Sequence, residues 1–319
     1  MNIKNKQMSY ILQEYGSFIA LLFLIVVIGI VSPEFRTINN FLSLLRQSSI
    51  NGLIAFGMTM VILTGGIDLS VGSTLAISAA LCAGMITNMG IPVPVAMLLT
   101  LVVGLLFGGI SGLLITKGRL QPFIATLITM TVYRGFTMIY MDGRPISNLS
   151  NSKYVLPKAL VFIGRGEIFG IPVPIIIFIF VFILFFIVLN KTTFGRKVYA
   201  IGSNDRCAKL AGISITKVKM IVYCVSGLMA SLSSLILLSR LNSAQPTLGT
   251  GYELDAIASV ALGGTSMNGG RGKILGTLIG ILIIAVLNNG LNILGVSSYY
   301  QSVVKGIVIL IAVISDKNR

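Results

Sequence analysis

Apolar residues fill most of the chain, in long runs separated by short polar or glycine-rich segments. An apolar run of about 20 residues is long enough to span a bilayer as a helix. Because such runs recur along the whole chain, we expect an all-α polytopic membrane protein with about ten transmembrane helices in a single domain, residues 1–319. The expected spans are residues 15–31, 49–63, 71–87, 93–115, 121–141, 174–189, 218–238, 254–262, 274–294 and 299–315.

The polar segments between the expected spans differ in length and charge. Residues 1–14 are expected to form a tail, and residues 39–46 a short amphipathic helix on the membrane surface. Residues 142–171 mix charge with glycine and proline, which argues against a span and predicts a longer connection. Residues 191–217 stay polar and basic between two apolar runs, so they are expected to form the principal loop of the protein.

Composition excludes most soluble classes. The chain is 55% hydrophobic and only 10% charged, whereas a soluble domain carries about a quarter charged residues. The net charge of +15 does not indicate nucleic-acid binding, because no basic stripe alternates with stacking aromatic residues. The chain has no histidine and only three widely spaced cysteines. We therefore expect no metal site, no cofactor in this chain and no enzymatic activity.

Basic residues indicate the orientation, since they accumulate in cytoplasmic loops. Ten spans would place both termini in the cytoplasm. The basic residues then expected inside are Lys4, Lys6, Lys117, Arg119, Lys191, Arg196, Lys197, Arg206, Lys209, Lys217, Lys219, Arg271, Lys273, Lys317 and Arg319. Those expected outside are fewer, namely Arg36, Arg46, Arg144, Lys153, Lys158, Arg165 and Arg240. The loop at residues 191–217 is therefore predicted to be cytoplasmic.

Within that loop, Gly202 and Gly212 bracket a segment that can form a short helix, residues 203–211. Either Ser203 or Asn204 could serve as its N-cap. A short helix held off the membrane can insert into a groove of a partner protein. The candidate contact residues are Gly202, Ser203, Asn204, Asp205, Arg206, Ala208, Lys209, Ala211 and Gly212.

Asp68 lies at membrane depth or at its inner edge, in the sequence VILTGGIDLSVGS. A charge in hydrocarbon is expensive, so it should face protein or water and have a partner. Gly65, Gly66 and Gly72 permit a broken helix here. Asp68 is either part of an ion or substrate site, or it caps the third span by accepting from free N–H groups.

Other polar residues also fall inside expected spans. Arg134 and Lys305 either extend to the outer interface or line a polar path. Glu253 and Asp255 begin the short span at residues 254–262, where acids complement the helix dipole and where catalysis is not expected. Three amides of one span either join helices by hydrogen bonds or line a pore: Asn288, Asn289 and Asn292.

Five segments carry a resemblance to a known family: VILTGGIDLSVGS, KGRLQPFIATL, AIGSNDRCAKLAGI, AQPTLGTGYELDAIASVALGGTSMNGGRGKILGT and LNNGLNILGVSSYYQ. They resemble the membrane-spanning permeases of bacterial ABC sugar importers, and within that family they are most similar to the ribose permeases. The resemblance extends over residues 32–315, although residues 148–170 contribute little to it. It implies a multi-pass protein of the bacterial cytoplasmic (inner) membrane that imports a monosaccharide, with ribose as the expected substrate.

The resemblance also implies partners: a second copy of the chain, a cytoplasmic ATP-binding subunit and an extracytoplasmic sugar-binding protein. The sequence contains no GxxxxGK[ST] motif, so ATP would be used by the partner ATPase. Residues 195–213 are similar to the loop by which the family contacts its ATPase. An alternative is an ion-coupled secondary transporter of a small polar solute, which would need acids such as Asp68 within the membrane.

Overall fold

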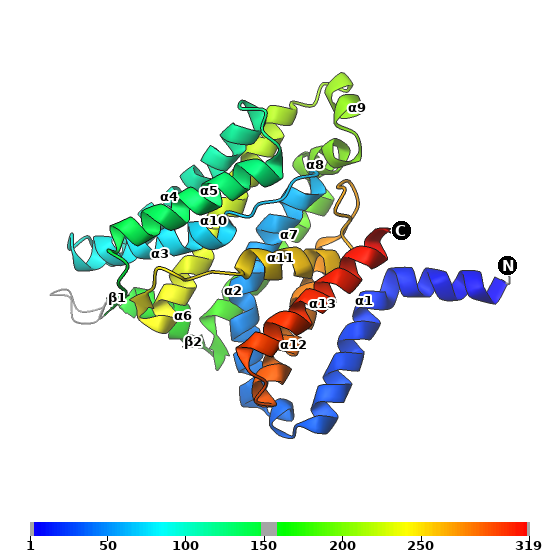
Figure 1. Cartoon of the computed structure of the whole chain (residues 1–319), viewed down its shortest axis with the longest axis horizontal. Helices are drawn as coiled ribbons and strands as arrows, with labels where there is room; N and C mark the ends of the chain where they lie inside the picture. Colours follow the sequence, from blue (N-terminus) through cyan, green and yellow to red (C-terminus); the bar gives the residue numbers. More distant parts are fainter. Residues whose placement is uncertain (1–2, 148–157, 318–319) are drawn as a thin grey trace.

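The computed structural model describes residues 3–147 and 158–317, of which residues 3–15, 158, 309 and 311–317 are described by their backbone alone. The described chain forms a helical bundle (Figure 1). Its helices are α1 (Ile3–Val31), η1 (Glu34–Arg36), α2 (Ile38–Leu63), α3 (Val71–Thr87), α4 (Val93–Thr116), α5 (Pro122–Tyr140), α6 (Lys158–Arg165), α7 (Val173–Lys191), α8 (Thr193–Ser203), α9 (Asp205–Leu210), α10 (Ile215–Leu241), α11 (Tyr252–Leu262), α12 (Ile274–Ile293) and α13 (Ser298–Lys317). Its two-residue strands are β1 (Ile146–Ser147), β2 (Glu167–Ile168), β3 (Ile171–Pro172) and β4 (Ser243–Ala244).

Helix α2 lies at the centre of the bundle, where it contacts α7, α8, α10, α11 and α12. Its side chains from Leu53 onward are almost all buried, and Phe56 stacks on Phe178 of α7 at 5.1 Å between ring centroids. The prediction of a separate surface helix at residues 39–46 is wrong, because those residues form the start of α2. The hydroxyls of Ser48 and Ser49 donate to the carbonyls of the preceding turn, which lets this polar interruption remain helical.

Small residues allow α4 and α10 to pack closely, as the glycines of α4 predict. A Cβ added at Gly227 would collide with the carbonyl oxygen of Gly104, and one added at Gly108 would collide with that of Tyr223. The two backbones are therefore in direct contact. This pair joins α2 to the outer layer of α3, α4 and α5 (Figure 1).

Two short helices, α3 and α11, begin inside the bundle after irregular segments at residues 64–70 and 245–251. A Cβ at Gly72, in the first turn of α3, would collide with the carbonyl oxygen of Gly249, just before α11. Gly249 and Gly251 have φ angles of +71° and +85°, which glycine adopts without steric cost. The N-terminal ends of α3 and α11 therefore lie next to each other.

The expected connection at residues 142–171 contains structure of its own. Strand β1 pairs antiparallel with β4, and β2 pairs with β3. Helix α6 is held against α10 by a hydrogen bond from the amide of Gly164 to the hydroxyl of Ser239, 3.2 Å. Residues 148–157 of this connection lie outside the described residues.

The bundle bears out a polytopic, helical membrane protein. Among the described residues, five helices are long and apolar enough to cross a membrane, namely α4, α5, α7, α10 and α12. Two shorter apolar helices are residues 16–31 and α3. A total of ten spans stays a prediction. Residues 3–14, which were expected to form a tail, are helical. Figure 1 shows α1 bent so that its first part turns away from the bundle.

Candidate functional site

The polar segment after α7 forms two short helices, each capped by a side chain. Thr192 accepts from the amide of Gly195 at the start of α8, 3.2 Å, and Asn204 accepts from the amide of Cys207 at the start of α9, 3.0 Å. The helix expected at residues 203–211 is therefore α9, and Asn204 rather than Ser203 is its N-cap. Helix α8 was not predicted, although Val198 and Ile201, both buried, have the spacing of one helix face.

Helix α9 projects from the bundle (Figure 1) and exposes most of its predicted contact residues. Its Asp205, Arg206 and Lys209 are exposed, whereas Ala208 is buried against the rest of the segment. Leu210 is 88% exposed, and sequence reasoning missed it. The available signal was that Leu210 is the one large apolar residue between Gly202 and Gly212, since an exposed side chain of this kind often marks a contact with another protein.

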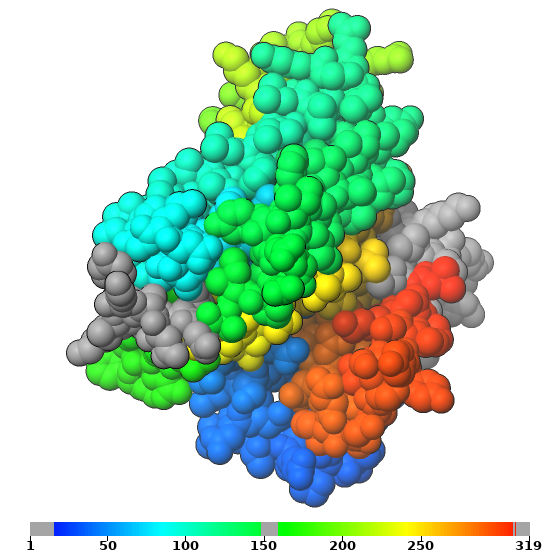
Figure 2. All heavy atoms as spheres, turned by 60° about the vertical axis from the view of Figure 1, so that its left-hand side comes forward, coloured from blue at the N-terminus to red at the C-terminus, as the bar shows by residue number. Residues whose placement is uncertain are grey.

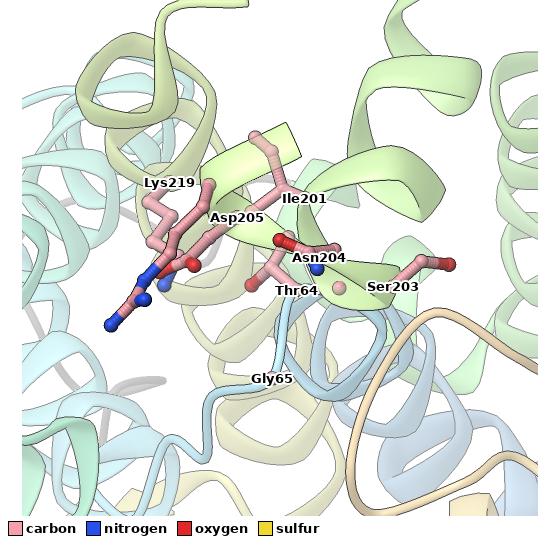
Figure 3. A pocket seen from close by; sticks show the side chains of 9 residues that line it. Thr64, Gly65, Ile201, Ser203, Asn204, Asp205 and Lys219 are labelled. Atoms are coloured by element: carbon pink, nitrogen blue, oxygen red, sulfur yellow. The ribbon is translucent and has the colours of Figure 1, made fainter. Parts of the chain in front are cut away.

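A hollow of about 480 Å³ lies beside α8 and α9. It is lined by Thr64, Gly65, Ile201, Gly202, Ser203, Asn204, Asp205, Arg206 and Lys219. Figure 3 shows Asp205 and Lys219 on one side of the hollow and Ser203 on the other, with the end of α2 at Thr64 below. Five of the predicted contact residues therefore line one concave surface, next to the point where the central helix ends.

Three chain segments meet beside this hollow with their backbones in contact. A Cβ at Gly202 of α8 would collide with the carbonyl oxygen of Leu63 and the amide of Gly270. That amide also donates to the Leu63 carbonyl, 3.0 Å. The Tyr199 hydroxyl donates to the carbonyl of Gly272, 3.0 Å. Burial raises the pKa of this phenol. Helix α8 thus binds the segments that follow both α2 and α11.

Asp68 lies in the irregular segment before α3 and is 1% exposed. Its Oδ1 accepts from the amide and the hydroxyl of Ser70, 3.0 and 2.6 Å, and its Oδ2 accepts from the Ser226 hydroxyl of α10, 2.7 Å. The N-cap position of α3 is Ser70. Asp68 therefore accepts a hydrogen bond from the backbone of Ser70, just before α3. This role resembles the capping of α3, which was one of the two predicted roles. Its hydrogen bonds fasten the broken segment to α10.

Arg134 and Lys305 both bind groups of the protein. Arg134 Nη1 donates to the carbonyls of Pro246 and Leu248, both at 2.8 Å. These carbonyls belong to the irregular segment before α11, where backbone groups need partners inside the bundle. Lys305 Nζ lies 3.1 Å from Oδ2 of Asp255 in the first turn of α11. Both basic residues therefore bind the chain at the start of α11. The sequence did not reveal this role, because the groups they bind are distant along the chain.

The three asparagines of α12 have different environments. Asn289 and Asn40 of α2 exchange two amide hydrogen bonds, 2.8 and 3.0 Å. Asn292 accepts from Gln301 of α13, 2.8 Å. Oδ1 of Asn288 is buried, and no described residue donates to it. Asn289 and Asn292 therefore join helices, which was one of the two expectations, while Asn288 keeps a free acceptor.

Comparisons with known proteins agree with this architecture. Residues 40–313 match the family described as branched-chain amino acid transport system / permease component. The ribose import permease protein of Bacillus subtilis (strain 168) is 55% identical over 309 residues, 97% of this chain and 94% of that protein. The corresponding protein of Haemophilus influenzae is 49% identical over 312 residues, 98% and 95% of the two chains.

A more distant relative extends the same pattern. The D-allose transport system permease protein of Escherichia coli (strain K12) is 39% identical over 305 residues, 95% of this chain and 91% of that protein. No solved structure matches the chain. The match to the family covers most of the chain. It includes α2, the irregular segments at residues 64–70 and 245–251, and the two short helices α8 and α9. The chain therefore belongs to this permease family of multi-pass membrane transport proteins.

Proposed function

We propose that this chain is the membrane subunit of an ATP-driven ABC importer that carries ribose across the bacterial cytoplasmic membrane. The observation that carries the proposal is identity of 49–55% with ribose import permeases over nearly the whole chain. Transport of a neutral sugar fits a bundle whose ionisable groups bind one another or the backbone, as Lys305 and Arg134 do.

The ATPase partner would bind at α9 and the neighbouring hollow. Helix α9 exposes charged side chains together with Leu210, which is a suitable combination for insertion into a groove of another protein. Helix α8 would pass the movement on, because Gly202 contacts the carbonyl of Leu63 at the end of α2 and the amide of Gly270 after α11. A shift of α8 would then move two segments together. This role requires α8 and α9 to be cytoplasmic, which the excess of basic residues in this segment supports. With ten spans, both termini would also be cytoplasmic.

A second copy of the chain would complete the pathway. The side chain of Lys305 lies well inside α13 and is 27% exposed. Exposure of lysine to lipid at such a position costs about 2.5–3.5 kcal/mol, so a covered, water-filled surface suits it better. A sugar-binding protein would deliver the sugar from the opposite side of the membrane.

Reconstitution tests the proposal. Proteoliposomes that contain this chain, the ATPase and the binding protein should take up labelled ribose only when ATP is present on the ATPase side. Omission of either partner should abolish uptake. If the chain alone accumulates ribose and an ionophore stops it, the protein is an ion-coupled transporter and the proposal is wrong.

A further inference from the structure

We infer that Asp255, Lys305, Asn51 and Asn288 form a transit site for the hydroxyl groups of a neutral sugar inside the membrane. The inference rests on the proposed function and adds the place in the bundle where the sugar is held. The four residues come from four helices, α11, α13, α2 and α12, which meet around the short helix α11.

Asp255 is the centre of the site. Its side chain is 9% exposed, and its Oδ2 accepts from Lys305 Nζ at 3.1 Å and from Asn51 Nδ2 at 3.3 Å. No described residue donates to its Oδ1, so half of a nearly buried carboxylate has no hydrogen bond. The Asp255 side chain keeps some exposed surface, so a ligand or water can donate to this oxygen.

A second free acceptor lies close by. Asn288 and Asn51 line a cavity of about 20 Å³ together with Gln47, Ser48 and Ser259. Oδ1 of Asn288 is buried without a donor among the described residues. Apolar side chains complete the lining, namely Leu44, Ile281, Ile284 and Ala285. A cavity of this size with polar groups on one side has room for about one water molecule. The cavity is too small for a sugar, so here it would hold a water or a single hydroxyl group at its edge.

The opposite side of the site is open. Figure 2 shows the yellow-to-gold segment that contains α11 at the base of a hollow between α5, in green, and α12 and α13, in orange and red. Helix α13, which contains Lys305, forms the red wall of this hollow. The Lys305 side chain is 27% exposed. Lys305 is partly exposed whereas Oδ1 of Asn288 is buried, so a solute that enters from the exposed side would reach Lys305 before Asn288.

The chemistry selects a neutral molecule with several hydroxyl groups. Oδ1 of Asn288 is buried without a donor among the described residues, and both described donors to Asp255 bind its Oδ2. The free oxygens accept hydrogen bonds and would repel an anion. Lys305 already neutralises Asp255, so a cation would gain little and would be repelled by the ammonium group. Sugar hydroxyls both donate and accept, so they can donate to the free oxygens and accept from Lys305. One ion pair and two amides give a weak site, which suits transit because a tight site would retain the sugar.

Charge variants test the inference in the complete complex, reconstituted with the ATPase and the binding protein. Asp255→Asn and Lys305→Met should each lower ribose uptake per ATP hydrolysed at least tenfold. The control is Glu167→Gln, which breaks an ion pair of similar length, 3.2 Å to Arg46, at an exposed position; it should transport like the unmodified complex. If the unmodified complex fails to import ribose, the proposed function is wrong. If it imports ribose and Asp255→Asn behaves like the control, only this inference is wrong.

A charge reversal separates a transit site from a simple connection between α11 and α13. The double variant Asp255→Lys with Lys305→Asp restores an ion pair but moves the carboxylate away from Asn51. A transit site predicts that uptake stays at least tenfold low even when the complex assembles and unfolds at the normal temperature. Recovery of uptake in the double variant would show that the pair only connects the helices, and would overturn the inference.

Thiol labelling gives an independent measurement. Lys305→Cys, in a background with Cys207→Ser and Cys224→Ser, should react with a membrane-impermeant thiosulfonate, and transported ribose should slow the reaction several-fold. Ile307→Cys is the matched control, because Ile307 is 52% exposed but lies about 200° around the same helix. Equal rates at both positions, or no effect of ribose at position 305, would contradict a sugar site in the hollow.

Discussion

Gly202→Ala tests the backbone junction through which α8 would move the rest of the bundle. The added methyl group would collide with the carbonyl oxygen of Leu63 and the amide of Gly270, and would lie 3.0 Å from the Leu63 carbonyl carbon. All of these are backbone atoms, so no side chain can rotate to make room. The segments must separate, which also weakens the 3.0 Å hydrogen bond from Gly270 to Leu63.

The expected cost of Gly202→Ala is the sum of two destabilising terms and one stabilising term. Overpacking costs about 1–3 kcal/mol, and loss of one buried hydrogen bond costs about 1 kcal/mol. Alanine improves helix propensity in α8 by about 1 kcal/mol. The net cost at the junction is therefore roughly 1–3 kcal/mol, and a coupling energy of this size corresponds to about a 5- to 150-fold change in an equilibrium between two states.

The assay is ribose uptake per ATP hydrolysed by the reconstituted complex. Gly202→Ala should lower this ratio by about the same 5- to 150-fold while the complex still assembles. Gly16→Ala is the control, because position 16 is also helical and a Cβ there meets no atom within 4 Å. If Gly202→Ala and Gly16→Ala give the same ribose uptake per ATP hydrolysed, the junction does not transmit the movement of α8.

Three further predictions concern single hydrogen-bonding side chains. Asn204→Ala removes the cap of α9, which should cost about 1 kcal/mol and weaken binding of the ATPase subunit; Asn204→Asp should retain binding. Asn40→Ala breaks the amide pair with Asn289, and a double-mutant cycle measured by thermal unfolding in detergent should give a coupling of about 1 kcal/mol. Arg134→Met leaves two backbone carbonyls without a donor, at about 1–3 kcal/mol each, and should lower the unfolding temperature far more than Arg36→Met at an exposed position.

Each of these predictions has an outcome that would contradict it. If Asn204→Ala and Asn204→Asp bind the ATPase with equal affinity, α9 does not contribute to the contact with the ATPase. Additive effects of the two asparagine substitutions would mean that the observed amide pair contributes no stability. An unfolding temperature of Arg134→Met equal to that of Arg36→Met would mean that water or another donor satisfies the carbonyls.

Hydropathy and local signals predicted much of the fold from the sequence. The expected spans at residues 71–87, 93–115 and 274–294 differ from α3, α4 and α12 by at most one residue at either end. Asn204 was one of two predicted caps, and it caps α9. These successes share a cause: span length, capping and turn formation depend on residues within a few positions of one another.

The local signals failed where a polar run remained helical. The sequence predicted a break at residues 47–48, yet α2 continues through them. The hydroxyls of Ser48 and Ser49 bind the preceding turn, and both serines are buried. Helix α8 was missed for a similar reason. The charged residues of this segment indicated a loop, and the apolar face at Val198 and Ile201 was overlooked. That face is buried, and packing against the rest of the chain stabilises the helix.

The sequence alone therefore determined the class of protein and the extent of most helices, and it predicted which polar segment would bind a partner. Only the tertiary structure decided what the polar residues inside the membrane do. The groups that bind one another are far apart in the chain: 50 residues between Asp255 and Lys305, and 249 between Asn40 and Asn289. The cost of burying a polar group is a local property that the sequence reveals, whereas the partner that offsets this cost depends on which helices pack together.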